Sequence, residues 1–240
     1  MFQARAQQRS IPGAVATVGV NERVAFLRRT YGHLAGAILA FVAVSAFLQT
    51  SGFAYKFASW MVAGSSLNLF LVFGLFIASG FITDRLARSE TSAGIQYVGL
   101  GLGVAAFAIF LSPMLLVARA YVHDPYIIEK AALFTLLIFG GLTATVFITR
   151  KDFSFLRGIL MVATLAAFGI ILASIFFGFH LGTIFSLAMI VLMGGYILYE
   201  TSLLMAYFRP TQHVAAALML FSTIATLFLY VLRLLMSLRE

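Results

Sequence analysis

One carboxylic acid lies within an otherwise apolar stretch of this chain. Glu200 occurs in the segment GGYILYETSLLMAYF, residues 194–208, whereas the other seven of the eight acidic residues lie in tails, loops or helix ends. An ionised carboxylate at the centre of a membrane helix costs about 3 kcal/mol, and we expect no Lys or Arg at the same depth. We therefore predict that Glu200 is neutralised by a proton or faces a wet cavity, and that it senses pH or lines an ion pathway. A purely structural hydrogen-bonding role is the alternative.

Three residues with hydroxyl groups are expected to share one helix face near this acid. Thr223, Thr226 and Tyr230 occupy positions i, i+3 and i+7 of the last apolar run, a spacing that places them on one side of a helix. A short connection makes the last two runs antiparallel neighbours, so Thr223 enters the membrane to a depth similar to that of Glu200. We predict that these four residues form an ion-pathway or pH-sensing site. The alternative is that each hydroxyl bonds to the carbonyl four residues before it.

The residue types that most catalytic and metal sites need are missing or isolated. The chain has no Cys, no HExxH zinc motif and no pair of buried acids that would suit an aspartyl protease. Ser79 has only His33 and His180 as conceivable bases, and both lie near the ends of apolar runs. We predict that the protein is not an enzyme and that it holds no metal and no cofactor.

The composition requires a membrane protein. Hydrophobic residues make up 62% of the chain and charged residues 10%, so a soluble fold would expose most of its apolar side chains. A helix needs about 20 apolar residues to cross the hydrocarbon core, and runs near that length occur seven times. We therefore predict an all-α, polytopic membrane protein. The predicted spans are Tyr31–Gln49, Met61–Ile82, Ala93–Ala118, Ala131–Thr149, Leu156–Gly178, Leu181–Met205 and Val214–Met236.

The positions of the basic residues indicate the orientation, because Lys and Arg resist translocation across a membrane. With the N-terminus inside, the cytoplasmic segments contain eleven of the sixteen basic residues and the opposite face contains five. We therefore predict a cytoplasmic N-terminus. The net charge of +8 is dispersed over the loops, so topology explains it and no nucleic-acid partner is expected.

Only the start of the chain lies outside the predicted bundle. Residues 1–25 are polar and basic, and we predict a mobile N-terminal tail there, with a docking segment as the alternative. Residues 26–240 form one predicted seven-helix transmembrane domain, embedded in the lipid bilayer.

Glycines at short spacings predict where helices approach closely. Gly32 with Gly36, and Gly99 with Gly101 and Gly103, are at or near the spacing of small residues that line membrane helix contacts. We predict that these glycines pack helices within one bundle, with a dimer interface as the alternative.

Three segments resemble those of a known family. They are ALFTLLIFGGLTATVFITRKDFSFLRGIL from Ala132 to Leu160, GGYILYETSLL from Gly194 to Leu204, and TIATLFLYVLRLL from Thr223 to Leu235. Together with the size, the number of spans and the polar start, they make the chain similar to the Bax inhibitor-1 family, in its bacterial YccA-like branch, over residues 25–238.

The resemblance implies a seven-helix membrane fold whose last helix is enclosed by the other six. Members of this family are described as pH-sensitive calcium-leak proteins, and bacterial members also as partners of a membrane-bound ATP-dependent protease. The resemblance therefore implies a bacterial inner-membrane protein that passes Ca²⁺ or H⁺. A non-conducting modulator of such a protease is the alternative.

The resemblance also implies a role for the acid. In the family, two aspartates on the last two helices share a proton and control the closed and open forms. The first, in a YDT pattern, corresponds to Glu200 in YET, and the second, ten residues before an arginine, corresponds to Thr223. With one acid in place of two, the site can titrate only as a single group, so we expect no shared-proton latch. Ca²⁺ takes about six to eight oxygen ligands, so the lost carboxylate also weakens the case for calcium handling.

Overall fold

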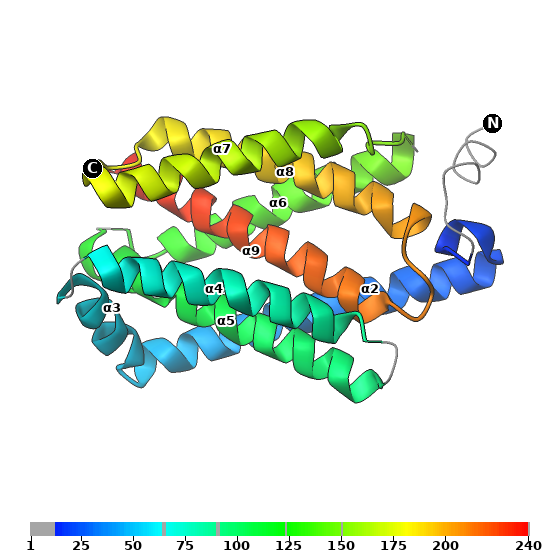
Figure 1. The fold of residues 1–240 in the computed structure, drawn as a ribbon, viewed down its shortest axis with the longest axis horizontal. Helices are drawn as coiled ribbons and strands as arrows, with labels where there is room; N and C mark the ends of the chain where they lie inside the picture. The colour runs from blue at the N-terminus through cyan, green and yellow to red at the C-terminus, as the bar shows by residue number, and fades with distance from the viewer. Residues whose placement is uncertain (1–12, 64–65, 90–91, 123, 150, 240) are drawn as a thin grey trace.

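The computed structural model describes residues 13–63, 66–89, 92–122, 124–149 and 151–239. The described residues form eight α-helices and one short 3-10 helix, η1, and no strand. Their bounds are η1 Val15–Thr17, α2 Val20–Thr50, α3 Phe53–Ala63, α4 Ser66–Ala87, α5 Ala93–Tyr121, α6 Ile127–Thr149, α7 Leu156–Phe177, α8 Thr183–Ala206 and α9 His213–Ser237. Figure 1 shows the long helices running roughly side by side.

Seven of these helices are long and apolar enough to cross a membrane, namely all except α3. The predicted all-α class with seven spans is therefore confirmed. The last five predicted spans agree with α5 to α9 to within a few residues at each end. At the end of α7, Gly178 adopts a left-handed conformation with φ 70°, which a residue with a side chain rarely adopts, and its N–H bonds to the Ser174 carbonyl.

The first two predicted spans need correction. Helix α2 begins at Val20 instead of Tyr31, and its 31 residues cover about 46 Å, more than the hydrocarbon core requires. Met61, predicted to begin the second span, lies in the 11-residue helix α3, and the span itself begins at Ser66. Residues 64–68 read GSSLN, a small and polar stretch typical of a break between helices, and the predicted span ran through it because the average hydropathy of the whole run stays high.

The segment before α2 is docked on the bundle. Ala14 and Val15 are fully buried, and the Val15 N–H donates a 2.9 Å hydrogen bond to the carbonyl of Phe208 between α8 and α9. The structure therefore places residues 14–16 of the predicted tail against the bundle, as the docking alternative expects, and the residues from Val20 onward in α2. Residues 1–12 of that predicted tail lie outside the described residues.

Helix α9 forms the centre of the bundle. In the apolar stretch of α9 that is long enough to cross a membrane, 78% of the residues are buried by protein, whereas the buried share of the other six spans is 39% or less. Figure 1 shows α9 crossing between the group formed by α6, α7 and α8 and the group formed by α2, α4 and α5. The expectation of an enclosed last helix is therefore confirmed.

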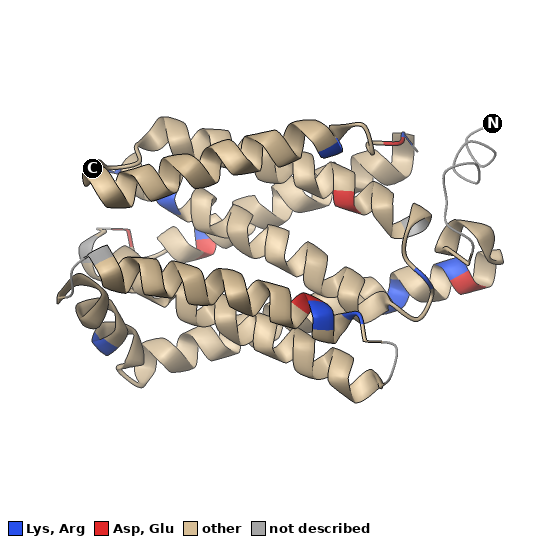
Figure 2. Ribbon diagram, in the orientation of Figure 1, with Lys and Arg blue, Asp and Glu red and all other residues tan. Residues whose placement is uncertain are grey.

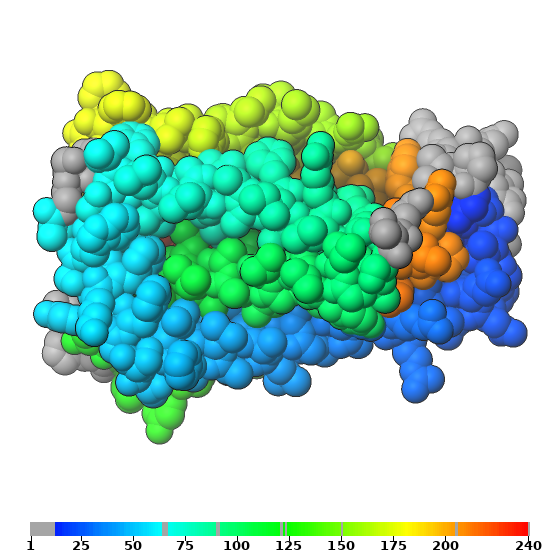
Figure 3. Space-filling model, turned by 60° about the horizontal axis from the view of Figure 1, so that its bottom comes forward, coloured from blue at the N-terminus to red at the C-terminus, as the bar shows by residue number. Residues whose placement is uncertain are grey.

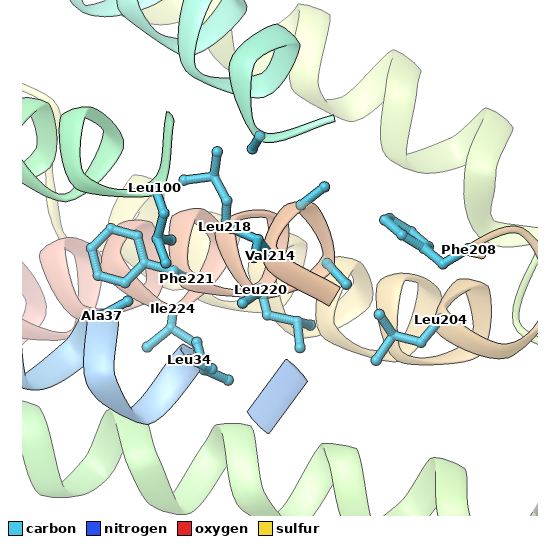
Figure 4. Packing of buried hydrophobic residues seen from close by; sticks show 14 of the residues in the cluster. Leu34, Ala37, Leu100, Leu204, Phe208, Val214, Leu218, Leu220, Phe221 and Ile224 are labelled. Atoms are coloured by element: carbon cyan, nitrogen blue, oxygen red, sulfur yellow. The ribbon is translucent and has the colours of Figure 1, made fainter. Parts of the chain in front are cut away.

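Two clusters of buried side chains surround α9, one toward each end of the helix. In the first, Phe221 and Ile224 of α9 lie among Leu34 of α2 and Leu100 of α5 (Figure 4). The second contains the C-terminal half of α9 together with residues of α5, α6 and α8. Phe41 of α2 packs against both clusters, so the interior is continuous along the bundle.

The predicted glycine contacts divide into two kinds. A Cβ at Gly99 would lie 2.6 Å from the Ala87 backbone nitrogen, and one at Gly103 would lie 2.6 Å from a Leu218 methyl carbon. These two glycines therefore allow α5 to approach α4 and α9, as predicted. A Cβ at Gly32, Gly36 or Gly101 would meet no atom within 4 Å, so the prediction of close packing is wrong there.

Candidate functional site

The predicted acid and its predicted neighbour are in direct contact. The Thr223 hydroxyl of α9 lies 2.9 Å from Oε1 and 2.8 Å from Oε2 of Glu200 on α8, within hydrogen-bonding distance of both. Each residue is only 7% exposed. The pair is therefore a polar contact inside a largely apolar bundle.

Short-range chain geometry brings the two residues together. Helices α8 and α9 pack closely, and the connection between them is short. Glu200 lies about 9 Å along α8 from that connection and Thr223 about 15 Å along α9, at a rise of 1.5 Å per residue. The two helices run in opposite directions from this connection, so the two residues lie on the same side of the bundle's length. The long Glu200 side chain covers the remaining distance and reaches Thr223.

The pair accommodates either protonation state of the acid. When Glu200 is ionised, the single Thr223 proton can be shared between two carboxylate oxygens. When Glu200 is protonated, its O–H can donate to Thr223 Oγ while the threonine donates to the other oxygen. A proton can therefore be gained or lost with both partners in place.

Two further buried hydroxyls lie beside each other between α8 and α2. Thr201 follows Glu200 in α8, and its hydroxyl lies beside the phenol of Tyr31 on α2. Neither hydroxyl has a hydrogen bond of good geometry among the described residues. Sequence reasoning missed both, although the position of Thr201 next to the acid was a signal for it. Nothing in the pattern around Tyr31 indicated a contact with α8.

Thr226 and Tyr230 do not join the acid. The Thr226 hydroxyl donates a 2.8 Å hydrogen bond to the carbonyl of Ser222, four residues before it in the same helix. The Tyr230 ring packs edge-on against Phe185 in the second cluster, with ring centroids 5.9 Å apart. Of the four predicted residues, only Glu200 and Thr223 are therefore in contact. Thr226 and Tyr230 share a helix face with Thr223, but they lie about 5 Å and 10 Å further along α9, beyond the reach of one carboxylate.

The surroundings of Glu200 lack a partner of positive charge among the residues that the structure describes. Among the described residues no Lys, Arg or His forms an ion pair with Glu200. Throughout the described residues, no group of three His, Asp or Glu side chains is placed to bind a metal ion. A cation that reached the site would meet one carboxylate, hydroxyls and backbone carbonyls.

Other charged groups gather at the two ends of the bundle (Figure 2). At one end, His33 of α2 accepts or donates a 3.0 Å hydrogen bond with Tyr97 of α5 and lies against His213 of α9. At the other, Asp124 bonds to Lys130 Nζ at 2.7 Å and pairs with Arg239 at 3.0 Å. The sequence pattern indicated neither contact, since each joins residues from separate segments.

The sequence is similar to one family along most of its length. The profile of the family described as Inhibitor of apoptosis-promoting Bax1 matches residues 23–240. Protein lifeguard 4 of Mus musculus is 30% identical over 224 residues, 91% of this chain and 87% of that protein. An uncharacterized protein of Pseudomonas aeruginosa is 30% identical over 234 residues, 95% of each chain. Protein LIFEGUARD 3 of Arabidopsis thaliana is 28% identical over 229 residues, 91% of this chain and 86% of that protein.

These similarities agree with the geometry. The matched region begins in the first turn of α2 and includes every membrane span, and the enclosed last helix occupies the position that the family resemblance implies. From the profile and the relatives together, the chain belongs to the Bax inhibitor-1 family, also called the lifeguard family, of multi-pass membrane proteins.

Proposed function

We propose that this protein is a pH-influenced leak or transport protein for Ca²⁺ or H⁺, in which Glu200 is the titrating group and Thr223 its hydrogen-bond partner. The observation that carries the proposal is the contact of one hydroxyl with both oxygens of an acid that is buried inside the bundle. An acid at this depth is rare in membrane helices unless it has a function.

Proton loss from Glu200 would change the balance between two arrangements of α8 and α9. The neutral pair fits the closed, apolar interior, whereas an ionised carboxylate is favoured by water or by a bound cation. Loss of the proton therefore favours an arrangement in which ions or water reach Glu200. We expect flux to rise as the pH rises through the titration of this group.

The number of acids sets the number of steps in the pH response of the flux. One isolated carboxyl group titrates over a single transition, whereas two coupled acids titrate in two separated steps. We expect one transition for this protein. The variant Thr223→Asp restores a second acid at the position that the family resemblance indicates, so we expect it to split the response into two steps.

Ion flux into liposomes that contain the purified protein tests the proposal. Glu200→Gln keeps the size and hydrogen-bonding capacity of the side chain but removes its proton equilibrium, so flux should no longer depend on pH. Glu22→Gln, at the exposed start of α2, is the matched control and should behave like the wild type. An unchanged pH response in Glu200→Gln would remove this acid from the mechanism.

The partnership with a membrane-bound ATP-dependent protease stays a second prediction from the family resemblance. Deletion of residues 1–12 tests it better than a longer deletion, because Val15 is buried and bonded to the bundle. Co-purification that is lost on this deletion and retained in Glu200→Gln would support a binding role. The opposite pattern would contradict it.

A further inference from the structure

A groove of about 1000 Å³ lies between α2 and α5, away from the Glu200 site. Figure 3 shows these two helices on one face of the molecule, with α2 in blue and the adjoining part of α5 in green. The floor of the groove is made of small residues, including Gly32, Gly36, Ala40 and Gly101. No atom lies within 4 Å of a Cβ placed at any of the three glycines, so the space belongs to no other part of the described chain.

The end of the groove toward the start of α2 is basic. Arg28 and Arg29 of α2 line it, are exposed, and form no ion pair with a described residue. His33 and Tyr97 complete this end, and they are held together by their 3.0 Å hydrogen bond. The His33 Nδ1 lies 2.7 Å from the Arg29 carbonyl, which can only accept, so this nitrogen carries a proton.

We propose that this groove binds one anionic phospholipid. Arg28 and Arg29 hold the phosphate of the headgroup, with Tyr97 and His33 at its side, and an acyl chain lies along the floor of small residues. Arginine suits this position because its planar guanidinium donates several hydrogen bonds to phosphate oxygens. Glycine and alanine suit the floor because they leave room for a chain to lie against the helix backbone.

The dimensions of the groove match one leaflet of a bilayer. From Arg29 to Val44, the last lining residue of α2, the helix rises about 22 Å, and one leaflet including its headgroups is about 20–22 Å thick. A lipid whose phosphate lies at Arg28 and Arg29 therefore has its chain within the groove. The anionic surface of the cytoplasmic leaflet also attracts basic residues close to the membrane.

A second copy of the chain fits the groove less well than a lipid. In a two-fold dimer the same patch meets itself, so α2 would pack on α2 of the partner. Such pairing places Arg28 and Arg29 of one copy near the same two arginines of the other. Like charges brought together in this way oppose association, whereas the phosphate of a lipid neutralises them.

Native mass spectrometry of the purified, delipidated protein in detergent tests the proposal. The probes are phosphatidylglycerol, phosphatidylcholine and water-soluble glycerol phosphate. We expect one phosphatidylglycerol to bind at least fivefold more tightly than phosphatidylcholine, and glycerol phosphate alone to bind poorly. The double variant Arg28→Gln with Arg29→Gln should bind both lipids equally. Gly36→Leu adds a side chain to the floor of the groove at a position where a Cβ meets no protein atom, so it should weaken binding of both lipids.

A double variant of equal charge controls for a general loss of positive surface. Arg85→Gln with Arg157→Gln removes two exposed arginines from α4 and α7 and should keep the preference for phosphatidylglycerol. Equal binding of the two lipids by the wild type would overturn the proposal, as would a preference that survives in the Arg28 and Arg29 variant. A dimer that Gly36→Leu disrupts would assign the groove to a second copy instead.

Discussion

The contact between Glu200 and Thr223 depends on one hydroxyl group. Replacement of Thr223 by Val keeps the shape of the side chain but leaves a buried carboxyl group without its partner. An unsatisfied buried polar group costs about 1–3 kcal/mol, so we expect Thr223→Val to lower the free energy of unfolding by that amount. The midpoint of thermal unfolding in detergent measures this loss.

Thr226→Val is the matched control for this prediction. Its hydroxyl bonds only to the Ser222 carbonyl of its own helix, which already takes part in the helical hydrogen-bond pattern. We expect a clearly smaller effect on the unfolding midpoint. Equal losses in the two variants would mean that the contact with the acid adds no stability.

Asp124 carries a pH dependence that is separate from the Glu200 site. The hydrogen bond from Lys130, together with the charge of Arg239, holds the pKa of the Asp124 carboxyl below its usual range. A depressed pKa in the folded state adds stability above the unfolded pKa of about 3.9, and that stability is lost as the pH falls through the folded value. Asp124→Asn should therefore be less stable than the wild type near neutral pH.

Unfolding midpoints measured from neutral to acid pH check this prediction. The difference between the wild type and Asp124→Asn should shrink as the pH falls below about 4. Glu129→Gln, an exposed carboxylate at the start of α6, is a suitable comparison because it has no such ion pair among the described residues. A difference that stays constant with pH would show that the ion pair of Asp124 is not its source.

At the scale of the helix, the glycines of α5 separate close packing from open space. A methyl group at Gly99 would lie 2.6 Å from the Ala87 backbone, which cannot move aside as a flexible side chain can. Overpacking of this kind costs about 1–3 kcal/mol, so Gly99→Ala should lower the unfolding midpoint. Gly101→Ala should leave it unchanged or raise it, because Cβ meets no atom within 4 Å and alanine favours helix. Similar results for both variants would contradict this assignment of the α4–α5 contact.

The whole molecule has two ends whose sides of the membrane can be measured. The chain contains no Cys, so single cysteines can be introduced without background labelling. Thr211→Cys, in the exposed α8–α9 connection, should be protected from an impermeant maleimide added to intact spheroplasts. Tyr126→Cys, 66% exposed at the opposite end, should be labelled. The reverse pattern would place the N-terminus outside.

Much of this architecture follows from local features of the sequence. Span lengths, the antiparallel pairing of α8 with α9 and the meeting of Glu200 with Thr223 all depend on hydropathy and on distance along two adjacent helices. The enclosed position of α9 came from the family resemblance, since a helix that faces lipid and one that faces protein are equally apolar.

What the sequence failed to predict depends on contacts between distant segments. The burial of Val15 requires the carbonyl of Phe208, which lies near the other end of the chain. The break before α4 is an exception, because the small and polar residues 64–68 marked it locally in the sequence. Thr226 was expected at the site because its helix face is correct. Its hydroxyl instead donates a hydrogen bond to the Ser222 carbonyl of the same helix.

The central position of α9 also determines the order in which the bundle can be completed. Chains are made from the N-terminus, and α9 is the last of the seven spans, so the surrounding helices enter the bilayer before the helix they enclose. Until then Glu200 is in the membrane without the hydroxyl that it contacts in the finished protein. The hydrogen bond between α8 and α9 therefore forms only in a fully inserted chain, and it distinguishes a completed bundle from one still being assembled.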